Sequence, residues 1–100
     1  MPVPAHQRAN HERSDDALMT IRGLAFCLDT VRDRDPAPEP TSDAALAQAV
    51  VMSLLIEKVQ DLEHLRRLEW VGLGGNSPGL SSEDVALALG EQAAPEKGAA

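Results

Sequence analysis

The 100-residue chain lacks the features that several classes of protein require. Its single cysteine, Cys27, cannot form a disulfide within the chain and is compatible with a reducing compartment. No apolar stretch precedes Asp15, so we expect no secretory signal peptide. The most apolar run, residues 44–56, is about a third shorter than the roughly 20 residues that a bilayer-spanning helix needs. These absences predict a cytoplasmic protein without a membrane span.

Clusters of lysine and arginine are also missing. The net charge is −7, from 9 basic and 16 acidic residues. The only adjacent basic pair, Arg66 and Arg67, stands between Glu63 and Glu69. Because nucleic-acid backbones are bound by clustered positive charge, nonspecific binding of nucleic acid is not expected.

No segment carries a strong catalytic, metal-binding or cofactor-binding motif. Glu57, Asp61 and His64 share one helix face, with the spacing of the carboxylate and histidine ligands in metal-binding bundles. This face points roughly 120–180° away from Leu55, so we interpret it as a solvated face. The glycine-rich residues 72–77 lack the lysine and the preceding strand of a phosphate-binding loop. We therefore predict no metal, no cofactor and no catalytic residue.

The most informative feature present is the apolar run at residues 44–56, in which only Gln48 and Ser53 are polar. One stripe of a helix through this run forms an ordinary core face. Leu46, Val50 and Leu54 fall on other sides, so the helix is apolar nearly all round. Such a helix needs more than one neighbour to cover it.

Three helices are predicted, separated by proline and glycine. The first begins with Ser14 as its N-cap, and its amphipathic pattern ends before Pro36. A proline-containing connection joins it to a second helix over residues 43–71, which predicts an antiparallel helical hairpin. A glycine-rich loop, residues 72–80, leads to a short third helix over residues 81–91.

Both ends of the chain, residues 1–13 and 92–100, contain proline and lack an apolar period, so we expect them to be disordered. The hairpin core, residues 14–71, is then so small that a lone core is marginal without a disulfide, a metal or a partner subunit. We predict an all-α protein: an antiparallel helical hairpin with a short third helix, which forms a four-helix bundle on dimerisation.

The predicted interface consists mainly of apolar residues that one neighbouring helix cannot cover. Gln48 within the apolar run is either a tolerated polar residue or a buried polar contact that fixes the register between subunits. The predicted interface residues are Leu46, Gln48, Val50, Leu54, Leu65, Leu68 and Trp70.

Two residues of the first helix leave alternatives open. Gly23 either faces solvent or permits another helix to approach closely. Cys27 lies at the flank of the apolar face without nearby positive charge, so we expect a packed thiol, with an interchain disulfide as the alternative.

The segment LSSEDVALALGE, residues 80–91, resembles the first half of a helix-turn-helix DNA-binding motif, with Ala86 and Gly90 at the positions of its small residue and turn glycine. The resemblance implies a recognition helix after the glycine. Pro95 interrupts that part of the chain, and only one lysine follows. We therefore favour a short packing helix.

These observations predict a small, acidic, non-enzymatic interaction protein, a regulatory subunit or adaptor. It would act by self-association, as a homodimer, or by binding a partner helix. A DNA-associated regulator that uses residues 80–91 is the first alternative. A small helical-bundle enzyme is the second, and it requires an inward-facing pocket lined by Arg66, Glu69 and a histidine.

Overall fold

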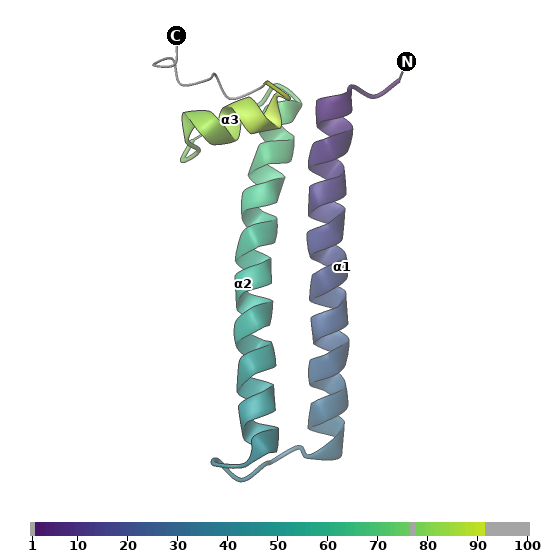
Figure 1. Cartoon of the computed structure of the whole chain (residues 1–100), viewed down its shortest axis with the longest axis vertical. Helices are drawn as coiled ribbons and strands as arrows, with labels where there is room; N and C mark the ends of the chain where they lie inside the picture. The colour runs from purple at the N-terminus through teal and green to yellow at the C-terminus, as the bar shows by residue number, and fades with distance from the viewer. Residues whose placement is uncertain (1, 77, 92–100) are drawn as a thin grey trace, which may run out of the picture. The chain divides into compact units, whose positions relative to one another are not determined.

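The computed structural model describes residues 2–76 and 78–91 of the chain, and all regular secondary structure in these ranges is helical. Helix α1 spans Ala5–Arg34, α2 spans Asp43–Gly72 and α3 spans Ser82–Ala88 (Figure 1). The two long helices run antiparallel and contact each other. The predicted all-α class and helical hairpin are therefore confirmed. The four-helix bundle formed on dimerisation stays a prediction. No described helix is long and apolar enough to span a bilayer.

The chain divides into two compact units, and each contains part of both long helices. The three-helix unit comprises Met1–Asp15 and Glu63–Ala100, and therefore includes α3. The two-helix unit comprises Asp16–Leu62, with the proline-containing connection between α1 and α2.

Helix α1 begins at Ala5, well before the predicted start at Ser14. The carbonyl oxygen of Pro4 accepts hydrogen bonds from the N–H groups of Gln7 and Arg8, both at 3.1 Å. Residues 5–13, which the sequence placed in a disordered tail, form the first turns of this helix. Their sequence shows no helical repeat of apolar residues, because the side chains that they turn toward the other helices are polar.

Four polar side chains at the start of α1 hold the ends of α2 and α3; we call His6, Gln7, Asn10 and Arg13 the polar clasp. The last carbonyl groups of a helix have no partner within it. His6 Nε2 is hydrogen-bonded to the carbonyl oxygen of Gly72 at 3.1 Å, and Gln7 Nε2 donates to the same oxygen at 3.3 Å. Both side chains therefore satisfy a carbonyl that the end of α2 leaves free.

Asn10 is the central residue of the polar clasp and is only 1% exposed. Its Nδ2 donates to the carbonyl oxygen of Ala88 at 2.8 Å and to that of Leu68 at 3.5 Å, and its Oδ1 accepts from Arg13 Nη2 at 2.6 Å. Gly72 makes this approach possible, because a Cβ there would collide with the Asn10 amide. One buried amide thus joins all three helices of the unit.

An apolar core lies beside the polar clasp in the three-helix unit. Leu68, Val71 and Ala88 are buried, with Leu68 only 2% exposed. The residues packed against them are Leu65, Leu80 and Val85. Helix α3 therefore folds over the end of α2 as a packing helix.

Serine side chains cap the starts of α2 and α3. The Ser42 hydroxyl accepts the Ala45 N–H at 3.1 Å, which caps α2. Ser81 and Asp84 form a reciprocal capping box at the start of α3. Helix α3 ends at Ala88, earlier than predicted, and Gly90 turns the chain with a φ of +75°.

The two-helix unit contains no buried residue: every position from 16 to 62 is exposed or half-buried. Along α1 the half-buried positions of this unit repeat at alternating intervals of four and three, the 3.5-residue period of a coiled-coil seam. They are Ala17, Ile21, Leu24, Leu28 and Val31. Along α2 the same spacing runs through Ala44, Gln48, Val51, Leu55, Lys58 and Leu62. The two helices therefore cover one narrow stripe of each other.

Replacement of Ser14 distinguishes the observed start of α1 from the predicted one. Ser14 lies inside the helix and is buried, and its hydroxyl has no hydrogen-bond partner among the described residues. Ser14→Ala removes that unsatisfied hydroxyl and improves helix propensity, so we expect the free energy of unfolding to rise by about 0.5–1.5 kcal/mol. Urea denaturation measures the change.

Ser42→Ala is the matched control, because it removes a true N-cap. We expect it to lower the free energy of unfolding by about 1 kcal/mol. A loss of stability in Ser14→Ala of the same size as in Ser42→Ala would contradict a helix that begins at Ala5.

Candidate functional site: exposed apolar surfaces and a tryptophan pocket

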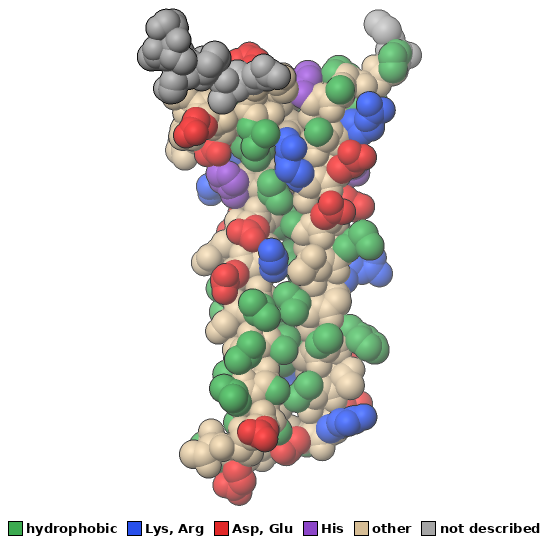
Figure 2. Space-filling model, in the orientation of Figure 1, with side chains coloured by type: hydrophobic (Ala, Val, Ile, Leu, Met, Phe, Trp, Pro, Cys, Tyr) green, Lys and Arg blue, Asp and Glu red, His purple; other side chains and the backbone are tan. Residues whose placement is uncertain are grey.

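An apolar row runs along the outside of α2 in the two-helix unit. Leu46, Val50 and Leu54, which we call the α2 ridge, follow one another at intervals of four and are all exposed. No charged residue occurs between Asp43 and Glu57. Figure 2 shows hydrophobic side chains gathered over both long helices in this unit. Three of the predicted interface residues thus form one accessible, uncharged row.

A second apolar row lies on another side of α2. Met52, Ile56 and Val59 are separated by intervals of four and three and are likewise exposed. The seam with α1 leaves both rows uncovered. Helix α2 is therefore apolar on several sides in the structure, as its sequence predicts.

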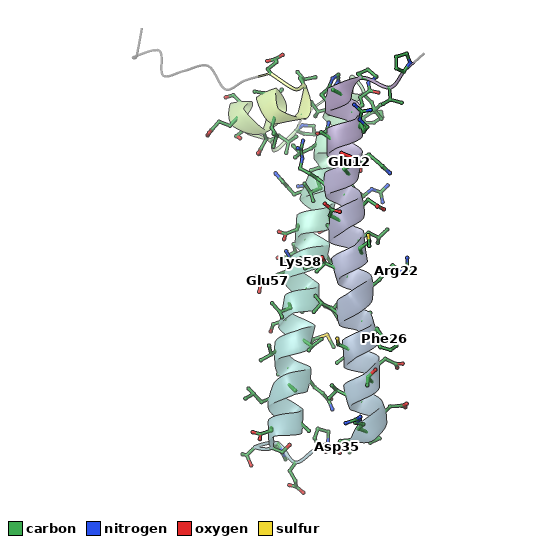
Figure 3. The ribbon with its side chains drawn as sticks, turned by 45° about the vertical axis from the view of Figure 1, so that its right-hand side comes forward. Glu12, Arg22, Phe26, Asp35, Glu57 and Lys58 are labelled. Atoms are coloured by element: carbon green, nitrogen blue, oxygen red, sulfur yellow. The ribbon has the colours of Figure 1, made fainter. Side chains whose placement is uncertain are left out.

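A shallow hollow of about 540 Å³ lies on α1, lined by Met19, Arg22, Gly23 and Phe26; we call it the α1 hollow. The side chains of Arg22 and Phe26 extend outward from α1 in Figure 3. The spacing i, i+3, i+4, i+7 is that of the four residues that form a hole in knobs-into-holes packing. A Cβ at Gly23 would meet no atom within 4 Å, so the floor of the hollow is open. Within this chain, Gly23 faces solvent.

The structure places Gln48 against its own hairpin connection and Cys27 at the surface. Gln48 is half-buried, and its Nε2 donates to the backbone carbonyl oxygen of Asp35 at 3.0 Å, just after α1. It therefore contributes to closing the hairpin within its own chain. Cys27 is exposed, so the prediction of a packed thiol is wrong. It lies between the seam positions Leu24 and Leu28 in the sequence but is not itself one of them.

The remaining predicted interface residues lie in the three-helix unit. Leu65 and Leu68 belong to the apolar core, and Leu68 is covered by its own chain. Trp70 is 57% exposed and marks a separate surface. The structure thus does not bring the seven predicted residues together into one surface.

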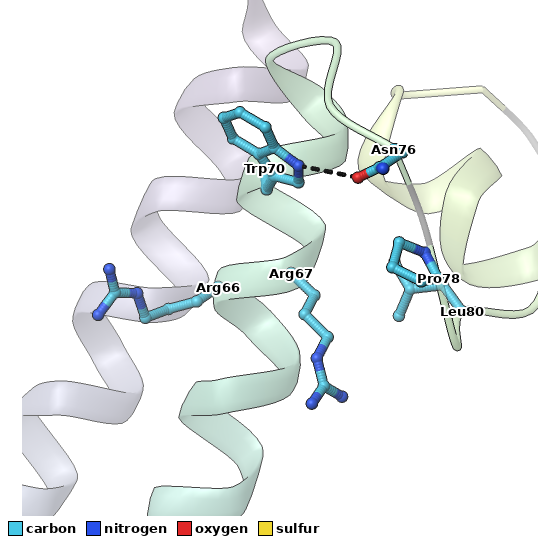
Figure 4. Close-up of a pocket in the computed structure, with 6 residues that line it drawn as sticks. All are labelled: Arg66, Arg67, Trp70, Asn76, Pro78 and Leu80. Carbon is cyan, nitrogen blue, oxygen red and sulfur yellow. Dashed lines mark hydrogen bonds between the residues drawn. The ribbon is translucent and has the colours of Figure 1, made fainter.

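Trp70 forms one wall of a half-open cavity of about 320 Å³ (Figure 4). Its indole Nε1–H donates to Asn76 Oδ1 at 3.4 Å. The ring lies directly against Gly75, where any side chain would collide with it. The cavity is lined by Arg66, Arg67, Trp70, Asn76, Pro78 and Leu80. Trp70 is a predicted interface residue, but its sequence context does not predict this cavity, which depends on the return of the glycine-rich loop against the indole.

Among the residues that the structure describes, the lining of the Trp70 cavity contains no carboxylate and no imidazole. The enzyme alternative requires Arg66, Glu69 and a histidine around one pocket, and only Arg66 is present. General acid–base chemistry needs a titratable group within hydrogen-bond reach of the substrate. The described lining therefore offers guanidinium groups, an amide and apolar side chains to a ligand.

The histidines contact neighbouring elements of the three-helix unit. His11 Nδ1 lies 3.7 Å from Glu69 Oε2, and His64 Nε2 lies 3.6 Å from Asp84 Oδ1. His64 therefore faces Asp84 of α3, and its side chain stays 43% exposed. Within residues 2–76 and 78–91, no three His, Cys, Asp or Glu side chains converge as a metal site would require.

Comparisons with models of protein families, with curated proteins and with solved structures find no match for this chain. Its function must therefore be inferred from the surfaces that its own residues form.

Proposed function

We propose that this protein is a small, acidic, non-enzymatic interaction protein, a regulatory subunit or adaptor, that self-associates through its two-helix unit. The observation that supports this most directly is the absence of any buried residue from 16 to 62. Helices in water depend on the packing of an apolar face for their stability. A helix pair that packs along one seam buries little apolar surface and therefore gains little stability. A second hairpin would supply the missing cover.

The exposed apolar surface of the two-helix unit is large enough for a stable interface. Nine large apolar side chains in this unit are between 40 and 72% exposed. At about 150–200 Å² for each fully exposed residue, they expose roughly 700–950 Å². A standard protein interface buries about 800 Å² on each partner. The nine residues are Leu18, Met19, Phe26, Leu46, Val50, Met52, Leu54, Ile56 and Val59.

A second copy of the chain supplies complementary shapes for this surface. Each copy carries an α2 ridge of large aliphatic side chains and an α1 hollow with a glycine at its floor. In a two-fold symmetric dimer, the ridge of each copy packs into the hollow of the other, so both contacts form at once. Two hairpins that associate in this way bring four helices together.

Polar substitution of the α2 ridge tests this proposal. We expect the wild-type chain to sediment as a dimer at micromolar concentration. The triple variant Leu46→Gln, Val50→Gln, Leu54→Gln removes three apolar contacts from each half of the symmetric interface. We expect its dimer dissociation constant to rise at least 100-fold, measured by sedimentation equilibrium.

The matched control replaces two exposed leucines of the three-helix unit, Leu73→Gln and Leu87→Gln. We expect this variant to dimerise like the wild type. A wild-type monomer whose two-helix unit stays fully helical at all concentrations would contradict self-association. Equal weakening by both sets of substitutions would contradict the choice of surface.

Filling the α1 hollow tests the packing in more detail. Gly23→Met removes a helix-destabilising glycine, so we expect the isolated hairpin to gain about 0.5–1 kcal/mol of stability. The same side chain fills the hollow and should weaken dimerisation at least tenfold. Far-UV circular dichroism at low concentration and sedimentation equilibrium measure the two effects.

Ala25→Met adds a side chain at an exposed position of α1 outside the hollow and serves as the control. It should leave the dimer dissociation constant within about threefold of the wild-type value, since exposed substitutions away from a contact change stability by at most about 0.5 kcal/mol. An unchanged dissociation constant in Gly23→Met would show that the hollow lies outside the interface.

A further inference from the structure

The Trp70 cavity lies in the three-helix unit and includes none of the residues that form the α2 ridge or the α1 hollow. Trp70 is the only tryptophan of the chain, and tyrosine is absent. A large aromatic side chain that is 57% exposed can offer much apolar contact area to a ligand.

The indole of Trp70 is held in position before any ligand arrives. Its Nε1–H bonds to Asn76, and its ring packs on Gly75. The N–H of Gly75 in turn donates to the carbonyl oxygen of Trp70 at 2.9 Å. Gly74, with a φ of +101°, makes the turn that returns the loop to the ring. A fixed ring loses little conformational freedom on binding, which favours affinity.

Two arginines line the cavity together with this ring. Arg66 and Arg67 precede Trp70 by four and three residues, so both are its neighbours on the helix surface. Their side chains extend in different directions from the turn of α2 that precedes Trp70 (Figure 4). Both are exposed, and neither forms an ion pair with any residue from 2 to 76 or 78 to 91. In a chain with net charge −7, two arginines of the cavity lining are thus available to an anion.

Apart from Asn76, the remaining lining is apolar. Pro78 and Leu80 face the cavity together with Trp70, and the volume of about 320 Å³ lies at the lower end of the range for small-molecule sites. Guanidinium groups bind carboxylates through paired, charge-assisted hydrogen bonds, while indole, proline and leucine accept a flat apolar body. We propose that this cavity binds a small carboxylate attached to a single aromatic ring.

Phenylacetate is a suitable probe, because it combines one carboxylate with one ring. Since Trp70 is the only tryptophan, its fluorescence reports the site without labelling. We expect a saturable change with a dissociation constant on the order of 0.1–1 mM, as is typical of a ligand of this size. Phenylacetamide, which lacks the charge, and acetate, which lacks the ring, should each bind at least tenfold more weakly. Raising the salt concentration should weaken phenylacetate binding as well.

The double variant Arg66→Gln, Arg67→Gln should weaken phenylacetate binding at least tenfold. Arg32→Gln, Arg34→Gln removes two exposed arginines of the two-helix unit and should leave binding unchanged. Calorimetry with Trp70→Ala tests the ring independently of fluorescence and should show no binding. Unchanged far-UV circular dichroism establishes that each variant is folded.

Equal affinity for phenylacetate and phenylacetamide would overturn the proposal. So would an equal loss of phenylacetate affinity in the two double arginine variants. So would the absence of a saturable signal at ten times the expected dissociation constant. A blocked peptide with aspartate beside phenylalanine forms a separate arm. Binding of this peptide without binding of phenylacetate would show a peptide-docking surface and would likewise overturn the assignment. Sedimentation of the dimer tests the proposed function separately, so either conclusion can fail alone.

Discussion

Two packed helices can hide only one stripe of each other from water, and the rest of this structure follows from that constraint. In the two-helix unit the stripe is the 3.5-residue seam, and it leaves every residue from 16 to 62 at least partly accessible. The apolar residues that remain, above all the α2 ridge, occupy sides of the helix that the seam cannot reach. We propose that a further partner covers these sides of α2, and a second hairpin is the simplest one.

The three-helix unit meets the same constraint within the chain. Helix α3 adds the neighbour that lets Leu68, Val71 and Ala88 become buried. The polar clasp then satisfies carbonyl groups at the ends of α2 and α3, which would otherwise be left without partners in a crowded region. Asn10 matters most because its single amide group contacts both helix ends. The three-helix unit is therefore stabilised by contacts within the chain. For the two-helix unit, we propose that association with a second copy supplies the stability.

Much of the fold could be predicted from local sequence signals. Ser42 and Ser81 mark helix starts, and the prolines from Pro36 onward separate the two long helices, because capping and proline geometry act within a few residues. The start of α1 could not be predicted in this way. Its first turns are held by hydrogen bonds from His6 and Asn10 to partners more than sixty residues away, and a polar face gives no periodic apolar signal.

The same contrast between local sequence signals and long-range contacts applies to the candidate sites. The apolar excess that includes Leu46 was visible in the sequence, because it follows from helical spacing alone. The Trp70 cavity is not visible in the sequence, since it depends on how the loop returns at Gly75 against the indole. Leu68 shows the converse: its spacing suggests an interface residue, yet α3 covers it within the chain.

Amide hydrogen exchange at two protein concentrations tests most directly whether a second copy covers α2. We expect amides of residues 44–56 to become more protected as concentration rises, because a second copy would then cover them. Amides around Leu68 in the three-helix unit should exchange at rates much less dependent on concentration. Equally strong protection of residues 44–56 at the lowest concentration would show that the two-helix unit is stable alone and would contradict the account.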